Sequence, residues 1–162
     1  MIVGDGDIAS VLPDRDDLLF FASGVSNSGE VPESEYRREI ALLSQQPRNK
    51  RLVYFSSLAI FYSDSRYARH KRAVEDTIKK YSKYYCIVRI GNITWGSNPH
   101  TLINYLKAHP EAEIRDEYRF IIDKEEFLFW INMIPPRNVE MNCPGRMLTV
   151  KEIHERYVTV HI

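Results

Sequence analysis

Tyr67 and Lys71 stand four residues apart in this chain, and an apolar run that ends at Ser56 and Ser57 precedes them. Residues four apart on a helix share a face, so the phenol and the ammonium would point at one site. A serine at the end of a strand could reach the same site. There the ammonium would stabilise a phenolate, the phenol could exchange a proton near neutral pH, and the serine hydroxyl could hold the substrate oxygen.

The spacing alone is a weak signal, because the chain contains ten tyrosines in 162 residues. A glycine-rich segment near the start strengthens it. Gly4-Asp5-Gly6-Asp7-Ile8-Ala9 follows a short apolar start and has the pattern G-x-G-x-x-A, in which the glycines let backbone approach a pyrophosphate at a helix N-terminus. A plain glycine-rich turn is the alternative interpretation.

Apolar runs that alternate with amphipathic segments predict an α/β fold with a mainly parallel sheet. We expect strands at 1–3, 17–22, 51–55, 84–90, 119–122 and 139–142, and an edge strand at 158–162. We expect helices at 7–12, 34–46, 66–81, 99–108, 124–133 and 149–156. Ser34 is the expected N-cap of the second helix, and Ser97 or Asn98 that of the fourth.

Composition excludes several classes of protein. Hydrophobic residues make up 44% and charged residues 27%, as in ordinary globular domains, and the net charge of zero does not suggest a nucleic-acid surface. The start lacks the pattern of a signal peptide and no apolar run approaches the length of a membrane span, so we expect a cytoplasmic protein. Cys86 and Cys143 have no CxxC spacing and are expected to be buried free thiols. No metal site is indicated.

The motifs, in this order, resemble the extended short-chain dehydrogenase/reductases, in particular the nucleotide-sugar epimerase/dehydratase branch. The matching segments are the glycine loop at 4–9, the strand at 17–22, the serine-bearing segment at 56–61, the YxxxK helix at 67–75, the segment 89–96 and the late helix start at 148–153. The resemblance implies one NAD(P)-binding, truncated Rossmann-like domain over 1–162, a doubly wound sheet with flanking helices. It also implies a homodimer that pairs through the helices at 34–46 and 66–81.

The resemblance also assigns roles to individual residues. Tyr67 would be the general base, Lys71 would bind the nicotinamide ribose and tune Tyr67, Ser57 would position the reacting oxygen, and Asn92 would approach the substrate phosphate. The cofactor is expected to be NAD or NADP and the substrate a nucleotide-linked sugar. The expected cofactor contacts are Gly4, Gly6, Asp7, Ile8, Ala22, Ser23, Gly24, Tyr67, Lys71 and Ile90.

The departures from the family pattern concern the cofactor. The chain passes from Gly4 to Asp17 within about thirteen residues, as if the second and third strands were deleted, leaving the family's order 1-4-5-6. The deleted part carries the acidic residue that holds the adenosine ribose, so cofactor binding could be weak. His70 stands where serine is common and Glu39 where the family has asparagine. The substrate-side portion at about 110–162 is reduced.

These departures keep other interpretations open. The chain could be a non-catalytic nucleotide- or sugar-binding or regulatory module that retains the fold without the adenosine subsite. A partner subunit could also rebuild the missing wall. The retained Ser57, Tyr67 and Lys71 favour an enzyme.

Overall fold

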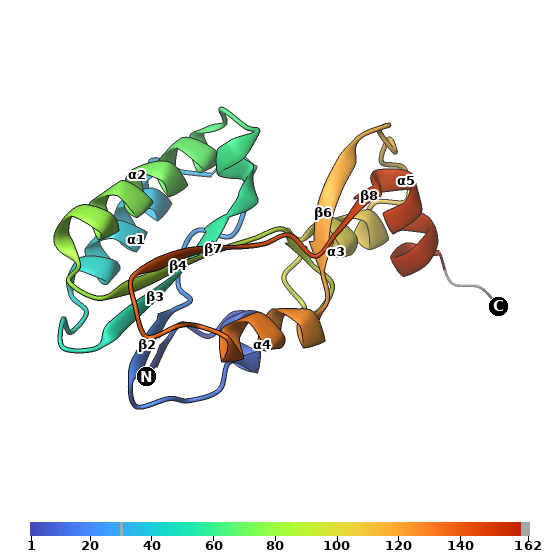
Figure 1. Ribbon diagram of the computed structural model, residues 1–162. Helices are drawn as coiled ribbons and strands as arrows, with labels where there is room; N and C mark the ends of the chain where they lie inside the picture. Colours follow the sequence, from blue (N-terminus) through green and yellow to red (C-terminus); the bar gives the residue numbers. More distant parts are fainter. Residues whose placement is uncertain (30, 160–162) are drawn as a thin grey trace.

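The computed structural model describes residues 1–29 and 31–159, and its main element is a five-stranded parallel sheet (Figure 1). The strand order is β1-β2-β3-β4-β7. The bounds are β1 Ile2–Val3, β2 Leu18–Phe21, β3 Arg51–Ser57, β4 Tyr85–Ile90 and β7 Val139–Cys143. The expected α/β class and parallel sheet are confirmed.

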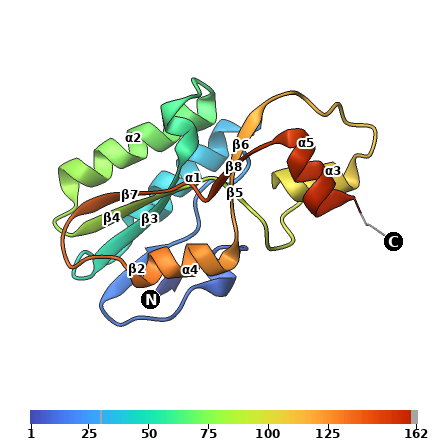
Figure 2. The ribbon, with the colours of Figure 1, turned by 45° about the vertical axis from the view of Figure 1, so that its right-hand side comes forward.

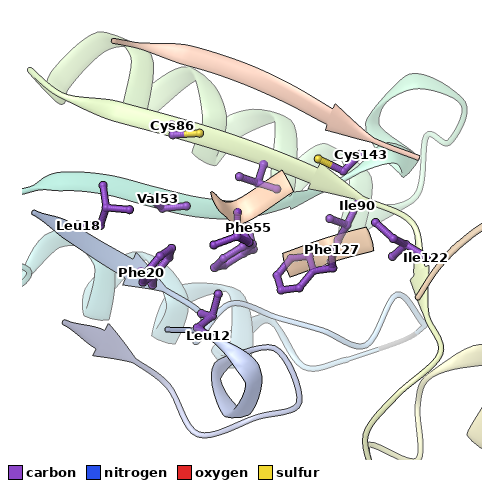
Figure 3. Close-up of a cluster of buried hydrophobic side chains, with 12 residues drawn as sticks. Leu12, Leu18, Phe20, Val53, Phe55, Cys86, Ile90, Ile122, Phe127 and Cys143 are labelled. Atoms are coloured by element: carbon purple, nitrogen blue, oxygen red, sulfur yellow. The ribbon is translucent and has the colours of Figure 1, made fainter. Parts of the chain in front are cut away.

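Helices cover both faces of this sheet, as its continuous apolar strands require. Figures 1 and 2 show α1 (Glu33–Ser44) and α2 (Arg66–Tyr81) on one face and α4 (Lys124–Asn132) on the other. Alternate strand residues therefore enter two cores. The core under α2 contains Leu19, Phe21, Tyr54, Val74, Ile78 and Ile87. The core under α4 contains Phe20, Val53, Phe55, Ile90 and Phe127, among others (Figure 3).

The strand order agrees with the deletion of two strands that the family resemblance implies. β1 lies directly beside β2, with Ile2 opposite Phe20 and Val3 opposite Phe21. Gly4 ends this short strand with φ +124°, and a Cβ there would lie 2.4 Å from the Ala22 carbonyl oxygen, so only glycine fits. β7 extends the sheet at its other edge, beside β4.

A second, three-stranded sheet lies beyond the carboxyl ends of β4 and β7 (Figure 2). It has the order β5-β6-β8, with bounds Asn92–Ile93, Tyr118–Ile122 and Arg146–Thr149. Around it lie α3 (Leu102–Ala108), α5 (Val150–Ile153) and the π-helical turn η3 (His154–Val158). Ile103, Ile121 and Ile153 form a small core of their own there.

Several expected elements differ from the structure. The helix expected at 7–12 is a single 3-10 turn, η1 (Ala9–Val11), because Pro13 follows and Asp7 is engaged elsewhere. The fourth helix begins at Leu102, and its N-cap is Thr101, whose hydroxyl accepts from the Asn104 N–H, so neither Ser97 nor Asn98 caps it.

Other expectations also differ from the structure. α1 begins at Glu33 after Pro32, so Ser34 lies inside the helix. Val158 belongs to η3 and not to an edge strand, since the Thr159 N–H bonds the His154 carbonyl; residues 160–162 of that expected strand lie outside the described residues. The short strands β5 and β8 were not predicted.

The structure also bears on the two cysteines, on membrane crossing and on the expected dimer helices. Cys86 and Cys143 are free and buried, and burial raises the pKa of each thiol to about 12. Within the described residues, no helix is long and apolar enough to cross a membrane. On the expected dimer helices, Ile40 is 52% exposed and Tyr81 is 63% exposed; the homodimer itself stays a prediction.

Candidate functional site

A cavity of about 1020 Å³ opens at the carboxyl ends of the parallel strands, where α/β sheets usually bind ligands. It also touches residues of the second sheet. Of the residues to which the sequence assigns roles, eleven line it: Gly6, Asp7, Ile8, Ala22, Ser23, Gly24, Ser57, Tyr67, Lys71, Ile90 and Asn92. Gly4 is not among the lining residues, since it packs against Ala22.

Tyr67 and Lys71 reach the cavity from the first turns of α2. The Ser65 hydroxyl caps this helix by accepting the Ala68 N–H, which fixes where the helix begins. The Lys71 Nζ atom lies 5.6 Å from the centre of the Tyr67 ring. The structure therefore brings the two side chains to one place, as the i, i+4 spacing predicts.

Lys71 is almost fully buried and is held by two partners, Glu39 of α1 and Tyr54 of β3. Its Nζ lies 3.3 Å from Glu39 Oε1 and 3.2 Å from Tyr54 Oη. An ammonium has three N–H donors, so these two contacts leave one for the cavity that Lys71 lines. Tyr54 received no role from the sequence, because an aromatic residue in an apolar strand is usually core.

Glu39 is the centre of this network and has no exposed surface. Its Oε1 accepts from Lys71 and from the Tyr54 hydroxyl, and its Oε2 accepts from His70 Nε2 at 2.9 Å and the Val25 N–H at 2.8 Å. Burial works to raise the pKa of Glu39, but the Lys71 charge and these hydrogen bonds outweigh it and lower the pKa to about 2. The carboxylate is thus ionised and fully satisfied.

The Glu39 network also affects Tyr54 and Gly24, which lie next to it. Burial, and next the Glu39 charge, raise the pKa of Tyr54 well above its usual range, so this phenol stays a neutral donor. Gly24 lies against the ion pair, since a Cβ there would be 2.8 Å from Lys71 Nζ and 3.0 Å from Glu39 Oε1. The loop that ends β2 therefore passes directly over the charged pair.

The two serines at the end of β3 differ in their surroundings. The Ser57 hydroxyl accepts the Ala59 N–H at 3.1 Å and caps the 3-10 turn η2 (Leu58–Phe61). Ser56 is 4% exposed and lines the cavity, and among the described residues its hydroxyl has no hydrogen-bond partner.

Two of the predicted ligand contacts have structural partners. The Asp7 carboxylate accepts the Ser97 and Asn98 N–H groups at 3.0 and 2.9 Å and ties the glycine loop to the segment after β5. The Asn92 side-chain amide donates to the Phe120 carbonyl at 3.0 Å.

The cavity also has two arginines that sequence reasoning missed, Arg38 and Arg119. Arg38 pairs with Glu35 and donates to the Ser23 carbonyl at 3.0 Å, whereas Arg119 pairs with Glu117. Neither arginine belongs to a motif, so only the fold shows that they lie here.

The cavity fits one half of a nicotinamide dinucleotide. Among the described residues, the Ser56 hydroxyl, which lines the cavity with Tyr67 and Lys71, has no hydrogen-bond partner, and a Cβ on Gly6 would meet nothing within 4 Å apart from its own chain neighbours. These features offer hydrogen bonds and space to a nicotinamide ribose. The adenosine half does not fit, because β1 is the sheet edge and η1 is one 3-10 turn that supplies no helix N-terminus for the pyrophosphate.

Comparisons with known proteins find similarity at the level of the fold. No protein-family model matches the chain, and no curated protein matches it. The fold is similar to that of the enzyme WbmG of Bordetella bronchiseptica, solved with NAD and UDP (TM-score 0.63, 15% identity, 86% of this chain and 54% of that one). It is also similar to that of the dTDP-glucose 4,6-dehydratase of Bacillus anthracis, solved with NAD (TM-score 0.65, 14% identity, 88% of this chain and 56% of that one). A third similar structure is that of the UDP-glucose 4-epimerase of Thermus thermophilus, solved with NAD (TM-score 0.63, 14% identity, 85% of this chain and 59% of that one).

These similarities show the fold alone. It is a Rossmann-like α/β fold, shared with the three proteins just named, and the chain spans a little over half the length of these proteins. The neighbours were solved with NAD, and one of them with UDP as well.

Proposed function

We propose that this chain is an NAD(P)-dependent oxidoreductase of the epimerase or dehydratase type that acts on a nucleotide-linked sugar. The observation that carries the proposal is that Tyr67, Lys71, the strand-end serines and the loop Ala22–Gly24 line one cavity at the carboxyl ends of the parallel strands. The fold of the neighbours supports it, since those proteins are named as nucleotide-sugar enzymes.

In this proposal each residue has one task. Tyr67 accepts the proton of a sugar hydroxyl and returns it later. Lys71, held by Glu39 and Tyr54, directs its remaining N–H at the ligand in the cavity. A serine at the end of β3 holds the reacting oxygen. A nicotinamide ring, when bound, supplies the hydride acceptor.

The reduced sheet predicts weak cofactor binding. The adenosine half of the dinucleotide finds no wall beside β1, so its contacts are lost. Each 1.4 kcal/mol of lost contact weakens binding about tenfold, so losing several kcal/mol of adenosine contacts weakens binding by orders of magnitude. A partner subunit that covers the open edge of β1 would restore it.

A non-catalytic nucleotide- or sugar-binding module is the second candidate. Two observations favour it: η1 gives no helix N-terminus to a pyrophosphate, and the Lys71 charge is paired with the buried Glu39. A lysine whose charge is paired with a carboxylate stabilises a nearby phenolate less than a lysine without such a partner does.

Titration calorimetry with NAD⁺, NADP⁺, nicotinamide mononucleotide and UDP separates these candidates. The enzyme proposal expects millimolar or tighter binding of a nicotinamide nucleotide, and turnover of a UDP- or dTDP-sugar that Tyr67→Phe abolishes. Binding of UDP without any nicotinamide nucleotide supports the binding module. Absence of binding by every probe at millimolar concentration contradicts both.

A further inference from the structure

Ser56 faces the helix that carries Tyr67 and Lys71. Successive side chains of a strand point to opposite faces, so Ser56 shares a face with Tyr54. The Tyr54 hydroxyl contacts Lys71 Nζ at 3.2 Å, which places this face under α2. Ser56 follows Tyr54 by two residues toward the carboxyl end of β3, where the cavity opens.

The pairing with β4 gives the same orientation independently. Ser56 lies opposite Arg89 in the parallel register, and neighbours in register share a face. The Arg89 guanidinium makes two hydrogen bonds, of 2.9 and 2.6 Å, with the carboxylate of Glu75 on α2. Ser56 therefore points toward α2.

The Ser57 side chain belongs to the opposite face of β3. It lies opposite Ile90, which packs with Phe55 and Phe127 in the core under α4 (Figure 3). Its hydroxyl also accepts the Ala59 N–H and so closes the first turn of η2. The resemblance assigns the substrate oxygen to Ser57, whereas strand geometry directs Ser56 toward Tyr67 and Lys71.

The Ser56 hydroxyl is also unsatisfied. It is buried, and within residues 1–29 and 31–159 it has no hydrogen-bond partner. A buried hydroxyl without a partner is unfavourable and uncommon in native proteins, so its presence calls for a ligand or a function. The residue lines the same cavity as Tyr67 and Lys71, which provides the place for that ligand.

We propose that Ser56 is the hydroxyl that binds the ligand oxygen beside Tyr67, and that Ser57 mainly caps η2. The inference deepens the proposed function and rests on it. A serine hydroxyl can donate to a carbonyl oxygen and accept from an alcohol. In an epimerase or dehydratase, a sugar carbon changes between alcohol and ketone. The Ser56 hydroxyl can therefore hydrogen-bond the oxygen on that carbon in both forms.

The test compares the Ser56→Ala and Ser57→Ala variants, with Ser44→Ala on the exposed face of α1 as a matched control. Isothermal titrations with UDP-glucose and with NAD⁺ measure binding, and thermal unfolding measures stability. Ser56→Ala is expected to weaken binding of at least one probe about tenfold, the equivalent of one hydrogen bond to an otherwise unsatisfied group. Its melting temperature should stay equal or rise, because the hydroxyl removed had no partner.

Ser57→Ala should instead lower the melting temperature by about 3 °C, as expected for a lost cap, and should weaken binding less than Ser56→Ala does. If the wild type binds a probe and Ser56→Ala binds it equally well, the assignment of Ser56 is wrong and the proposed function stands. A melting temperature several degrees lower in Ser56→Ala also overturns the assignment, because the hydroxyl would then have a structural partner. If the wild type binds neither these two probes nor NADP⁺, nicotinamide mononucleotide or UDP at millimolar concentration, both proposals fail.

Discussion

Acid should destabilise this protein through Glu39, and the size of the effect follows from the buried network. The pKa of this carboxyl is lowered from 4.5 to about 2 by Lys71 and the hydrogen bonds of His70, Tyr54 and Val25, against the effect of burial. Because the folded pKa lies below the unfolded one, the stabilisation is present above pH 4.5 and is lost as the pH falls toward 2. Such a shift is equivalent to about 3 kcal/mol, of which about 2 kcal/mol is lost by pH 3.

Glu39→Gln removes this dependence together with the charge. The variant leaves Lys71 buried without its carboxylate, which costs about 3–5 kcal/mol at pH 7. Urea unfolding of the wild type and the variant at pH 7 and pH 3 gives four free energies of unfolding. Between these pH values the wild type should lose about 2 kcal/mol more than Glu39→Gln. Exposed carboxylates such as Glu33 titrate in both proteins and cancel in the comparison.

A double variant keeps the test decisive if Glu39→Gln unfolds. Lys71→Met removes the partner charge, so Glu39→Gln/Lys71→Met should regain part of the lost stability, as expected for a buried ion pair. The reasoning is refuted if wild type and Glu39→Gln lose the same free energy between pH 7 and pH 3. It is also refuted if the single variant is as stable as the wild type at pH 7.

Three further predictions concern the site and the sheet. Tyr67→Phe should lower turnover of a nucleotide sugar at least ~100-fold with an unchanged melting temperature, and steady-state rates near those of the wild type would exclude Tyr67 as the base. Gly24→Ala should cost about 1–3 kcal/mol in urea unfolding, because its Cβ would stand 2.8 Å from Lys71 Nζ; an unaffected variant would show that the loop moves freely. Arg89→Met leaves Glu75 buried and unpaired and should cost about 3–5 kcal/mol, whereas a loss below ~1 kcal/mol would indicate that water reaches the pair.

The sequence by itself determined the parts of the fold that depend on local patterns. Apolar runs such as Leu18–Phe21 predict buried parallel strands, and the i, i+4 spacing of Tyr67 and Lys71 predicts a shared helix face. The short passage from Gly4 to Asp17 predicts that β1 lies beside β2, because no residues remain for intervening strands. The first two inferences need only spacing and hydrophobicity, whereas the third also uses the strand order that the family resemblance implies.

The helix expected after the glycine loop was decided by tertiary contacts. The pattern G-x-G-x-x-A favours a helix there, but the Asp7 carboxylate binds the Ser97 and Asn98 N–H groups, and Pro13 leaves room for a single 3-10 turn. The partners of Asp7 lie some ninety residues further along the chain, so local sequence could not reveal them. Strands β5 and β8 were missed for the same reason, since their pairing partners are distant.

The chemistry of the site also depended on the assembled structure. The sequence brings Ser56, Ser57, Tyr67 and Lys71 together but does not say which serine faces α2, because strand register and the end of β3 decide that. Nor does it show that Glu39 and Tyr54 hold the Lys71 ammonium, since three separate elements contribute to that contact. Spacing therefore determined which side chains meet, whereas burial and strand orientation determined which of them are free to act on a ligand.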